Sequence, residues 1–117
     1  MRLAVYSKIY GEQTLNDTSF NREVDGVFLD IEERVDELAD DIDIDSSGGV
    51  MTLTFQDGSN VILSRQVGSH EIWIAAKSGG YHLKLDDDNW VCGSTGENLA
   101  TLVDRLFIQQ GASGPFS

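Results

Sequence analysis

The chain has 117 residues, is 40% hydrophobic and carries a formal net charge of −12, with a pI near 4.2. This length predicts one domain with a single hydrophobic core. The acidic balance argues against nucleic acid or an anionic membrane as partner, and it favours cations or a basic protein surface. The single cysteine, Cys92, excludes an internal disulfide and fits a reducing compartment, so we expect a cytoplasmic protein.

The first fifteen residues have neither a helical nor a strand period, and we interpret residues 1–15 as an N-terminal appendage. Their apolar run is short and Lys8 follows at once, which is not typical of a signal peptide. No apolar run in the chain approaches the ~20 residues that a membrane-spanning helix needs.

A long amphipathic helix is predicted next, because apolar residues recur at steps of three and four. This stripe consists of Phe20, Val24, Val27, Phe28, Ile31, Val35 and Leu38. Asn16, Asp17 or Thr18 can cap its N-terminus, and it should end between Leu38 and Asp40.

Most of the negative charge belongs to this helix and the segment after it. Residues 17–45 hold twelve acidic and two basic residues, so they carry −10 of the net charge of −12. Past the helix, Ile42 and Ile44 alternate with aspartates over residues 40–45, which predicts an acidic strand. The negative field is therefore local, as expected of a surface feature.

Short alternating segments fill the middle of the chain and predict strands at residues 50–55, 60–65, 71–76, 81–85 and 90–92. Turns are predicted at residues 46–49, 57–58, 79–80 and 86–89, with Asp57-Gly58 as a two-residue hairpin turn. Ile72 and Ile74 should face the core, so the same alternation sends Trp73 to the opposite face of the sheet.

The last element is a second helix whose buried stripe is Leu99, Leu102, Val103 and Leu106. Thr95 can cap it, or Ser94 with Glu97 can form a capping box, and Gly111 should end it. Two helices with one apolar stripe each must cover the same face of an antiparallel sheet. The predicted fold is an α+β, two-layer sandwich with two terminal helices packed on one sheet face.

An ordered set of short motifs resembles the frataxin family in its bacterial, CyaY-type form. The motifs are IEERVD at 31–36, GGVMTLTF at 48–55, DGS at 57–59, RQ at 65–66, HEIWIA at 70–75, Lys77, GGYH at 79–82, WVC at 90–92 and TGE at 95–97. The resemblance covers roughly residues 16–110. It implies a frataxin-like domain at residues 16–117, with residues 1–15 outside the match, and the same two-layer fold.

The resemblance also implies a function in iron–sulfur cluster assembly. Frataxins bind iron weakly, as Fe²⁺ or Fe³⁺, on an acidic ridge of the first helix and first strand, and they bind and regulate cysteine desulfurase. Carried over by position, the metal-binding residues are Glu32, Glu33, Asp36, Glu37, Asp40, Asp41, Asp43 and Asp45. The partner-binding residues, for cysteine desulfurase and the iron–sulfur scaffold protein, are Glu32, Glu33, Asp36, Glu37, Trp73, Arg65 and Gln66. The resemblance implies a monomer and leaves iron-dependent oligomers open.

The residues themselves favour weak cation binding. An exposed ridge that offers only carboxylate oxygens suits hard cations, including divalent and trivalent ions other than iron, in several overlapping sites. The plain alternative is a solvated helix face without a ligand. Trp73 is expected to anchor a partner, while His70, His82 and Cys92 are expected to have structural roles.

Two other functions stay open from the sequence. A ferroxidase or iron-storage protein would favour Glu-x-x-His pairs on facing helices, and neither histidine has a glutamate three residues before it. We therefore expect no enzyme, although a weak ferroxidase-type activity is left open. An acidic mimic of nucleic acid would bind a basic nucleic-acid-binding protein without metal, which would distinguish it from an iron-dependent regulator.

Overall fold

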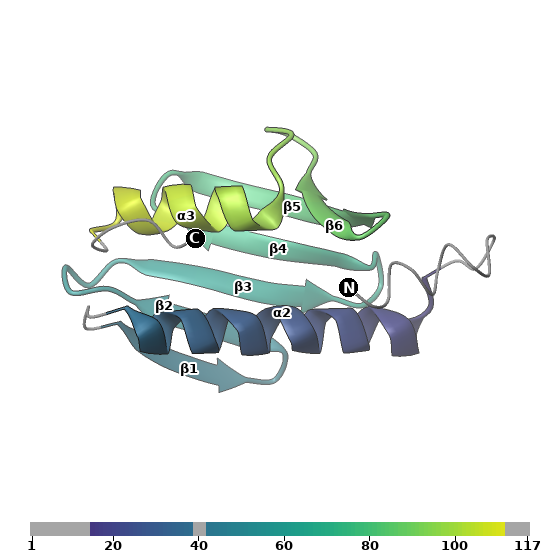
Figure 1. Ribbon diagram of the computed structural model, residues 1–117, viewed down its shortest axis with the longest axis horizontal. Coiled ribbons are helices and arrows are strands. Elements are labelled where there is room, and N and C mark those ends of the chain that lie inside the picture. The colour runs from purple at the N-terminus through teal and green to yellow at the C-terminus, as the bar shows by residue number, and fades with distance from the viewer. Residues whose placement is uncertain (1–14, 39–41, 112–117) are drawn as a thin grey trace.

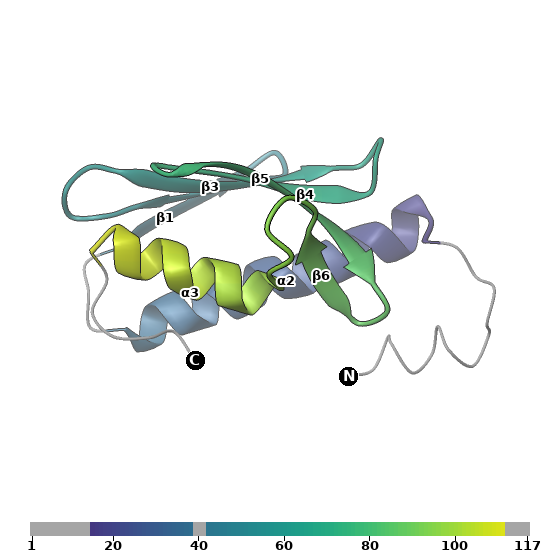
Figure 2. The same cartoon turned by 90° about the horizontal axis from the view of Figure 1, so that it is seen from above.

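The computed structural model describes residues 15–38 and 42–111. Two helices lie side by side on one face of a six-stranded antiparallel sheet, and no described element covers the other face (Figure 1, Figure 2). The predicted two-layer α+β sandwich is confirmed. The elements in chain order are α2 (Asp17–Glu37), β1 (Asp43–Ser47), β2 (Val50–Thr54), β3 (Asn60–Gln66), β4 (Glu71–Ala76), β5 (Gly79–Asp86), β6 (Asn89–Cys92) and α3 (Leu99–Gln109).

Helix α2 begins at a capping box. Asn16 Oδ1 accepts a hydrogen bond from the Ser19 backbone N–H at 2.9 Å, and Ser19 Oγ accepts one from the Asn16 N–H at 3.1 Å. These contacts satisfy backbone donors that have no partner within the helix. The predicted start is therefore confirmed. The helix ends at Glu37, one residue before the predicted range, because Leu38 turns to an extended conformation.

The core lies between the helices and the inner face of the sheet. The predicted stripe of α2 is confirmed, with Phe20, Val24, Phe28, Ile31 and Val35 buried and Val27 and Leu38 partly buried. Alternate strand residues meet these side chains from the sheet, and α3 adds its own stripe. The largest fully buried side chains from these elements include Met51, Leu53, Leu63, Ile72, Ile74, Leu83, Leu102 and Leu106.

The sheet register extends several strands beyond their predicted ends, β1 and β5 by the most. Ser46 and Ser47, predicted as turn residues, belong to β1 and pair with Met51 and Val50. The turn is only Gly48-Gly49, whose φ angles of 59° and 82° suit a tight two-residue hairpin. Residues 79–80 were also predicted as a turn, but both glycines pair with β4.

The hairpin between β2 and β3 is longer than predicted. The Gly58 N–H donates to the Phe55 carbonyl, and the Phe55 N–H donates to the Ser59 carbonyl, each at 2.9 Å. The loop therefore has three residues, Gln56 to Gly58, with Gly58 at a φ of 85°. Such a turn adds one residue in the left-handed region, which glycine supplies without strain.

The predicted start of the last helix is wrong. Residues 92–97 are held to β6, because the Cys92 N–H donates to the Glu97 carbonyl at 2.8 Å and the Gly96 N–H donates to the Cys92 carbonyl at 2.9 Å. Asn98 is the N-cap instead, and its Oδ1 accepts from the Thr101 N–H at 2.9 Å. The Glu97 carboxylate binds Arg105 and takes no part in a capping box.

Two predictions fall outside the described part of the chain. Most of the N-terminal appendage, 1–15, and the ridge residues Asp40 and Asp41 lie there. Within the described part, no helix is both long and apolar enough to span a membrane.

Candidate functional site

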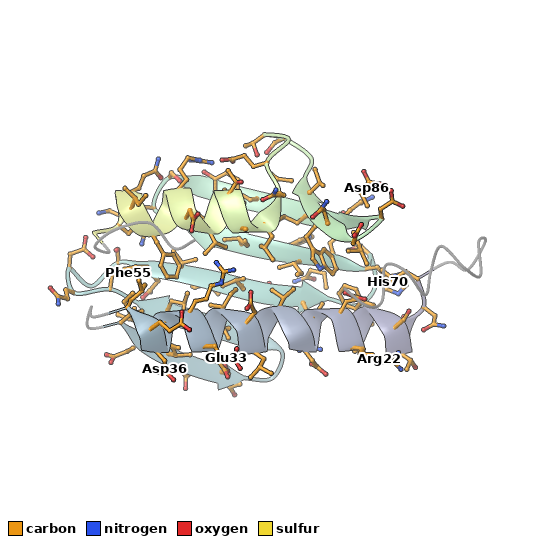
Figure 3. All side chains as sticks on the ribbon, in the orientation of Figure 1. Arg22, Glu33, Asp36, Phe55, His70 and Asp86 are labelled. Atoms are coloured by element: carbon orange, nitrogen blue, oxygen red, sulfur yellow. The ribbon has the colours of Figure 1, made fainter. Side chains whose placement is uncertain are left out.

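The acidic ridge is defined here by its described members, Glu32, Glu33, Asp36, Glu37, Asp43 and Asp45. The first four lie in the C-terminal half of α2, and the last two lie on β1, which runs beside that half at the edge of the sheet (Figure 1). Glu33 and Asp36 project from the outer side of α2 (Figure 3). Five of the six are exposed and Glu32 is half-buried.

Helix geometry brings the four helical carboxylates close together. Glu32 and Asp36 are one turn apart, as are Glu33 and Glu37, so the pairs form two adjacent acidic rows. Among the described residues, none of the four forms an ion pair with a basic side chain. Like charges at this spacing repel each other by ~0.2–0.5 kcal/mol per pair. A cation placed between the rows would relieve that repulsion.

The two strand aspartates extend the ridge around the edge of the sheet. Ile44 pairs with the buried Leu53 and faces the helices, so its neighbours Asp43 and Asp45 face the opposite, uncovered side. The acidic ridge therefore begins on the helix layer and reaches the open sheet face. The strand part of the ridge therefore shares the open sheet face with Trp73, whereas the helical part does not.

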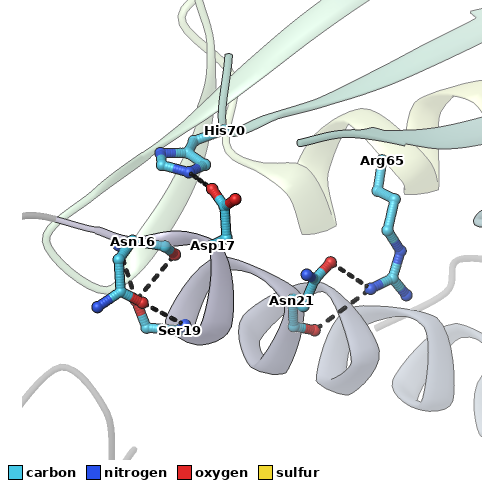
Figure 4. Close-up of polar contacts among 6 residues, drawn as sticks. All are labelled: Asn16, Asp17, Ser19, Asn21, Arg65 and His70. Carbon is cyan, nitrogen blue, oxygen red and sulfur yellow. Dashed lines mark hydrogen bonds and ion pairs between the residues drawn. The ribbon is translucent and has the colours of Figure 1, made fainter. Parts of the chain in front are cut away.

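The acids in the N-terminal half of α2 have basic partners, whereas the acidic ridge has none among the described residues. Asp17 Oδ1 lies 2.8 Å from His70 Nε2 in the loop between β3 and β4 (Figure 4). The His70 ring also packs against Phe20, with ring centroids 5.2 Å apart. Asp25 Oδ1 accepts from Arg65 Nη2 at 2.7 Å. These contacts hold the start of α2 on the sheet.

Arg65 lies between α2 and the sheet and does not join Trp73. Its register partner on β4 is the fully buried Ile72, so its side chain faces the helices. Nη1 donates to Asn21 Oδ1 at 2.9 Å and to the Asn21 carbonyl, as Figure 4 shows, and the guanidinium lies 5.2 Å from the centroid of the Phe28 ring. Arg65 was predicted as a partner-binding residue, and its placement is that of an internal anchor.

Trp73 lies on the open face, as the alternation predicts. The residue is 39% exposed, whereas Ile72 and Ile74 are buried. Its ring stacks on His82 of β5 with centroids 4.3 Å apart and an interplanar angle of 7°. Its indole Nε1–H donates to Glu71 Oε1 at 2.7 Å. The indole is therefore held in one orientation with part of its surface free.

Several residues around Trp73 were missed as site residues. The register places Ser47, Val50, Ser64, Trp73 and His82 in one row across the open face. Gln66, which was predicted, lies on the same face and donates to Ser64 Oγ at 3.1 Å. Alternation alone puts His82 on the side opposite Tyr81, but only the strand register shows that it stacks on Trp73.

Glu71 has a lowered pKa, first because the Trp73 indole N–H donates to its carboxylate. Burial opposes this shift, while Ser69 and Lys84 add to it. Lys84 Nζ lies 3.6 Å from Glu71 Oε2 across the β4–β5 pair. A negative charge is thus fixed beside the exposed indole.

Cys92 is fully buried, in agreement with the predicted structural thiol. Burial raises its pKa, but hydrogen bonds from Ser94 and Thr95 outweigh this and bring the pKa down to about 7. Its Sγ lies 3.4 Å from Ser94 Oγ. Nothing places it near the acidic ridge, because it lies at the opposite edge of the sheet, on β6.

The described residues contain no group of three or more His, Cys, Asp or Glu side chains arranged around one ion position. The ridge instead offers exposed carboxylates on two elements. Oxygen donors of this kind fit hard cations, and exposed side chains can rearrange around an incoming ion. The donor set therefore fits Fe²⁺ or Fe³⁺ carried as cargo.

Comparisons with known proteins agree with this fold. The family model described as a frataxin-like domain matches residues 13–113. A solved frataxin from Psychromonas ingrahamii, studied as a model for stability modulation within the CyaY protein family, is similar with a TM-score of 0.79 and 28% identity. That match covers 88% of this chain and 99% of the other.

Two structures of trimeric yeast frataxin share the fold, each with a TM-score of 0.64 and 24% identity over 85% of this chain. One is complexed with ferrous iron and matches over 88% of its length, and the other has the full-length N-terminus and matches over 82%. The chain belongs to the frataxin family, in its bacterial, CyaY-type form.

Proposed function

We propose that this protein binds iron weakly on the acidic ridge and regulates iron–sulfur cluster assembly by binding cysteine desulfurase through the same surface. Membership of the frataxin family supports the role in iron binding and cluster assembly. The observation that carries the proposal is the contrast along α2. Its first acids bind His70 and Arg65, whereas the ridge carboxylates have no basic partner among the described residues.

The protein acts in this proposal as a binding protein of the cytoplasm and not as an enzyme. Iron reduces the negative charge of the ridge, so it changes the attraction between the ridge and a basic desulfurase surface. Iron binding and desulfurase binding are therefore linked through one set of carboxylates. The scaffold protein for iron–sulfur clusters is the second partner, and it contacts the open face around Trp73.

The direct test is a titration of the protein into a cysteine desulfurase assay, with and without Fe²⁺. We expect the rate of sulfide release to change with protein concentration, and the size of that change to depend on iron. A rate that is unaffected by the protein under both conditions would refute the proposed regulation. An effect of the same size with and without iron would leave the proposed desulfurase binding intact and refute its dependence on iron.

The metal site can be mapped separately by NMR. Titration with Fe²⁺, or with a lanthanide as a hard-cation probe, should perturb the backbone signals of residues 32–45 first. Strongest shifts at His70 and His82 would instead place the ion away from the ridge.

The two surfaces should differ in their binding kinetics. Ridge charges act over a long range, so Glu33→Lys with Asp36→Lys should slow association with the desulfurase and weaken the dependence on salt. Trp73 makes short-range contacts, so Trp73→Ala should mainly speed dissociation from the desulfurase–scaffold assembly, by ~30-fold for a hot spot of ~2 kcal/mol.

Surface plasmon resonance at two salt concentrations distinguishes these effects. Trp73→Ala should keep the iron affinity of the wild type, while the ridge variant should lose it. If Trp73→Ala alters only the association rate, or lowers iron affinity as much as the ridge variant does, the division into two surfaces is wrong.

A further inference from the structure

Leu29 is an apolar residue on the acidic outer side of α2. Its exposed fraction is 55%, larger than the 39% of Trp73 on the open sheet face. Its neighbours one helical turn away are Asp25 and Gly26 before it and Glu32 and Glu33 after it. A leucine is therefore surrounded by three carboxylates and a glycine, on the side of the helix that faces away from the core.

No contact among the described residues explains why position 26 is a glycine. It lies in the interior of the helix, where glycine costs ~1 kcal/mol relative to alanine. A Cβ added at Gly26 would meet nothing within 4 Å, so close packing does not require glycine there. Helix propensity alone can explain Leu29, because leucine is a good helix former. It cannot explain Gly26, because glycine is a poor helix former.

Leu29 and Gly26 together interrupt the acidic surface with an uncharged patch. Side chains on a helix lean toward its N-terminus, so Leu29 covers the turn in which Gly26 lies. The missing side chain leaves bare backbone beside the leucine. Glu32 and Glu33, which have no ion-pair partner among the described residues, lie on the other side.

We propose that Leu29 and Gly26 form an apolar contact site beside the acidic ridge. A basic partner protein packs an apolar side chain, flanked by lysine or arginine, against this site. This inference rests on the proposed function, because it describes how the desulfurase docks. The charge complementarity comes from Glu32 and Glu33. Gly26 permits the close approach, and Leu29 supplies the buried area that charges alone do not give.

The test measures desulfurase affinity and melting temperature for the same variants. Gly26→Ala should raise the melting temperature by ~4 °C through helix propensity, yet weaken binding by ~5-fold through the added methyl group. Leu29→Ala should weaken binding by ~10-fold with no change in its salt dependence, and Leu29→Met should restore it. Ile108→Ala is the matched control, because Ile108 on α3 is 54% exposed and lies outside the ridge.

Opposite changes in stability and affinity for Gly26→Ala cannot arise from a purely structural glycine. Wild-type affinity in both Gly26→Ala and Leu29→Ala, when the wild-type protein binds, would overturn this inference and leave the proposed function intact. An equal loss in Ile108→Ala would also overturn it, since the effect would not be specific to the site. If the wild-type protein does not bind the desulfurase, the proposed function fails first and this inference falls with it.

Discussion

Helix α2 carries two groups of acids in opposite situations, apart from Asp30, which pairs with Arg34 one turn later. In the first half, Asp17 and Asp25 contact His70 and Arg65 from the sheet layer. In the second half, Glu33, Asp36 and Glu37 form no ion pair with any described basic side chain and lie exposed beside the edge strand β1.

The difference shows that acidity in this protein has two physical roles. Carboxylates with a partner among the described residues contact groups of the sheet layer, so part of their charge is balanced within the fold. Carboxylates without such a partner repel one another, so they oppose folding slightly and remain available to a cation or a basic surface. Only the second group is suited to reversible binding.

The largest expected effect comes from removing the basic anchor of the first half. Arg65→Met should lower the free energy of unfolding by ~2 kcal/mol, because it removes the charged hydrogen bonds to Asn21 and Asp25 and leaves their acceptors without that donor. Urea denaturation followed by circular dichroism measures this change.

Arg22→Met is the matched control for Arg65→Met. Arg22 is exposed on the same helix and has no ion pair among the described residues, so we expect a change within ~0.5 kcal/mol. If both substitutions have equal effects, Arg65 is not the anchor that its contacts indicate.

The second half should respond in the opposite direction. Replacing Glu33, Asp36 and Glu37 by glutamine or asparagine removes the repulsion between these carboxylates. It also removes their unfavourable interaction with the negative, C-terminal end of the helix dipole. The free energy of unfolding should rise by ~0.5–1 kcal/mol. Added salt should stabilise the wild-type protein more than this variant, because salt screens the same repulsion.

Asp25→Asn provides the comparison for this neutralisation. It also removes one negative charge from α2, but it turns the ion pair with Arg65 into a weaker, neutral-acceptor hydrogen bond, so stability should fall slightly. A fall in the melting temperature of the triple ridge variant would mean that the ridge carboxylates have structural partners within the chain.

The sequence predicts the layers of this fold well because burial has a period. The steps of three and four in α2 and the alternation around Trp73 depend only on local geometry, and both are confirmed by burial. Element ends were predicted less well where tertiary contacts decide them. The segment before α3 contains helix-capping residues, yet its hydrogen bonds to β6 delay the helix to Leu99.

Contacts between distant residues could not be predicted from the sequence. Arg65 follows Ser64 on a strand, and nothing local indicates that it reaches Asn21 and Asp25, 44 and 40 positions earlier, or that it turns away from Trp73. The stack of Trp73 on His82 likewise depends on the register between β4 and β5. The acidic character of the ridge is visible in the sequence, but the difference between partnered and unpartnered acids is not.

Glu71 extends the comparison to a partnered acid on the open face, and the expected effect is the smallest. The donation from the Trp73 indole holds the pKa of Glu71 below its ordinary value of 4.5. Between these two pKa values the unfolded chain binds more protons than the folded one, so stability rises with pH. The contribution of Glu71 is therefore complete above pH 4.5 and is lost as the pH falls through the folded pKa. Glu71→Gln keeps a carbonyl oxygen for the indole but does not titrate, so the variant should lose this part of the pH dependence. Urea midpoints measured at closely spaced pH values below 5 would reveal it, with Trp73 fluorescence as a second signal. The buried Trp90 also fluoresces, so Trp73→Phe identifies the contribution of Trp73. If the wild type and Glu71→Gln lose stability in parallel as the pH falls, the indole of Trp73 does not lower the pKa of Glu71. A nearby hydrogen-bond donor would then make no difference to the stability contributed by an acid on the open face.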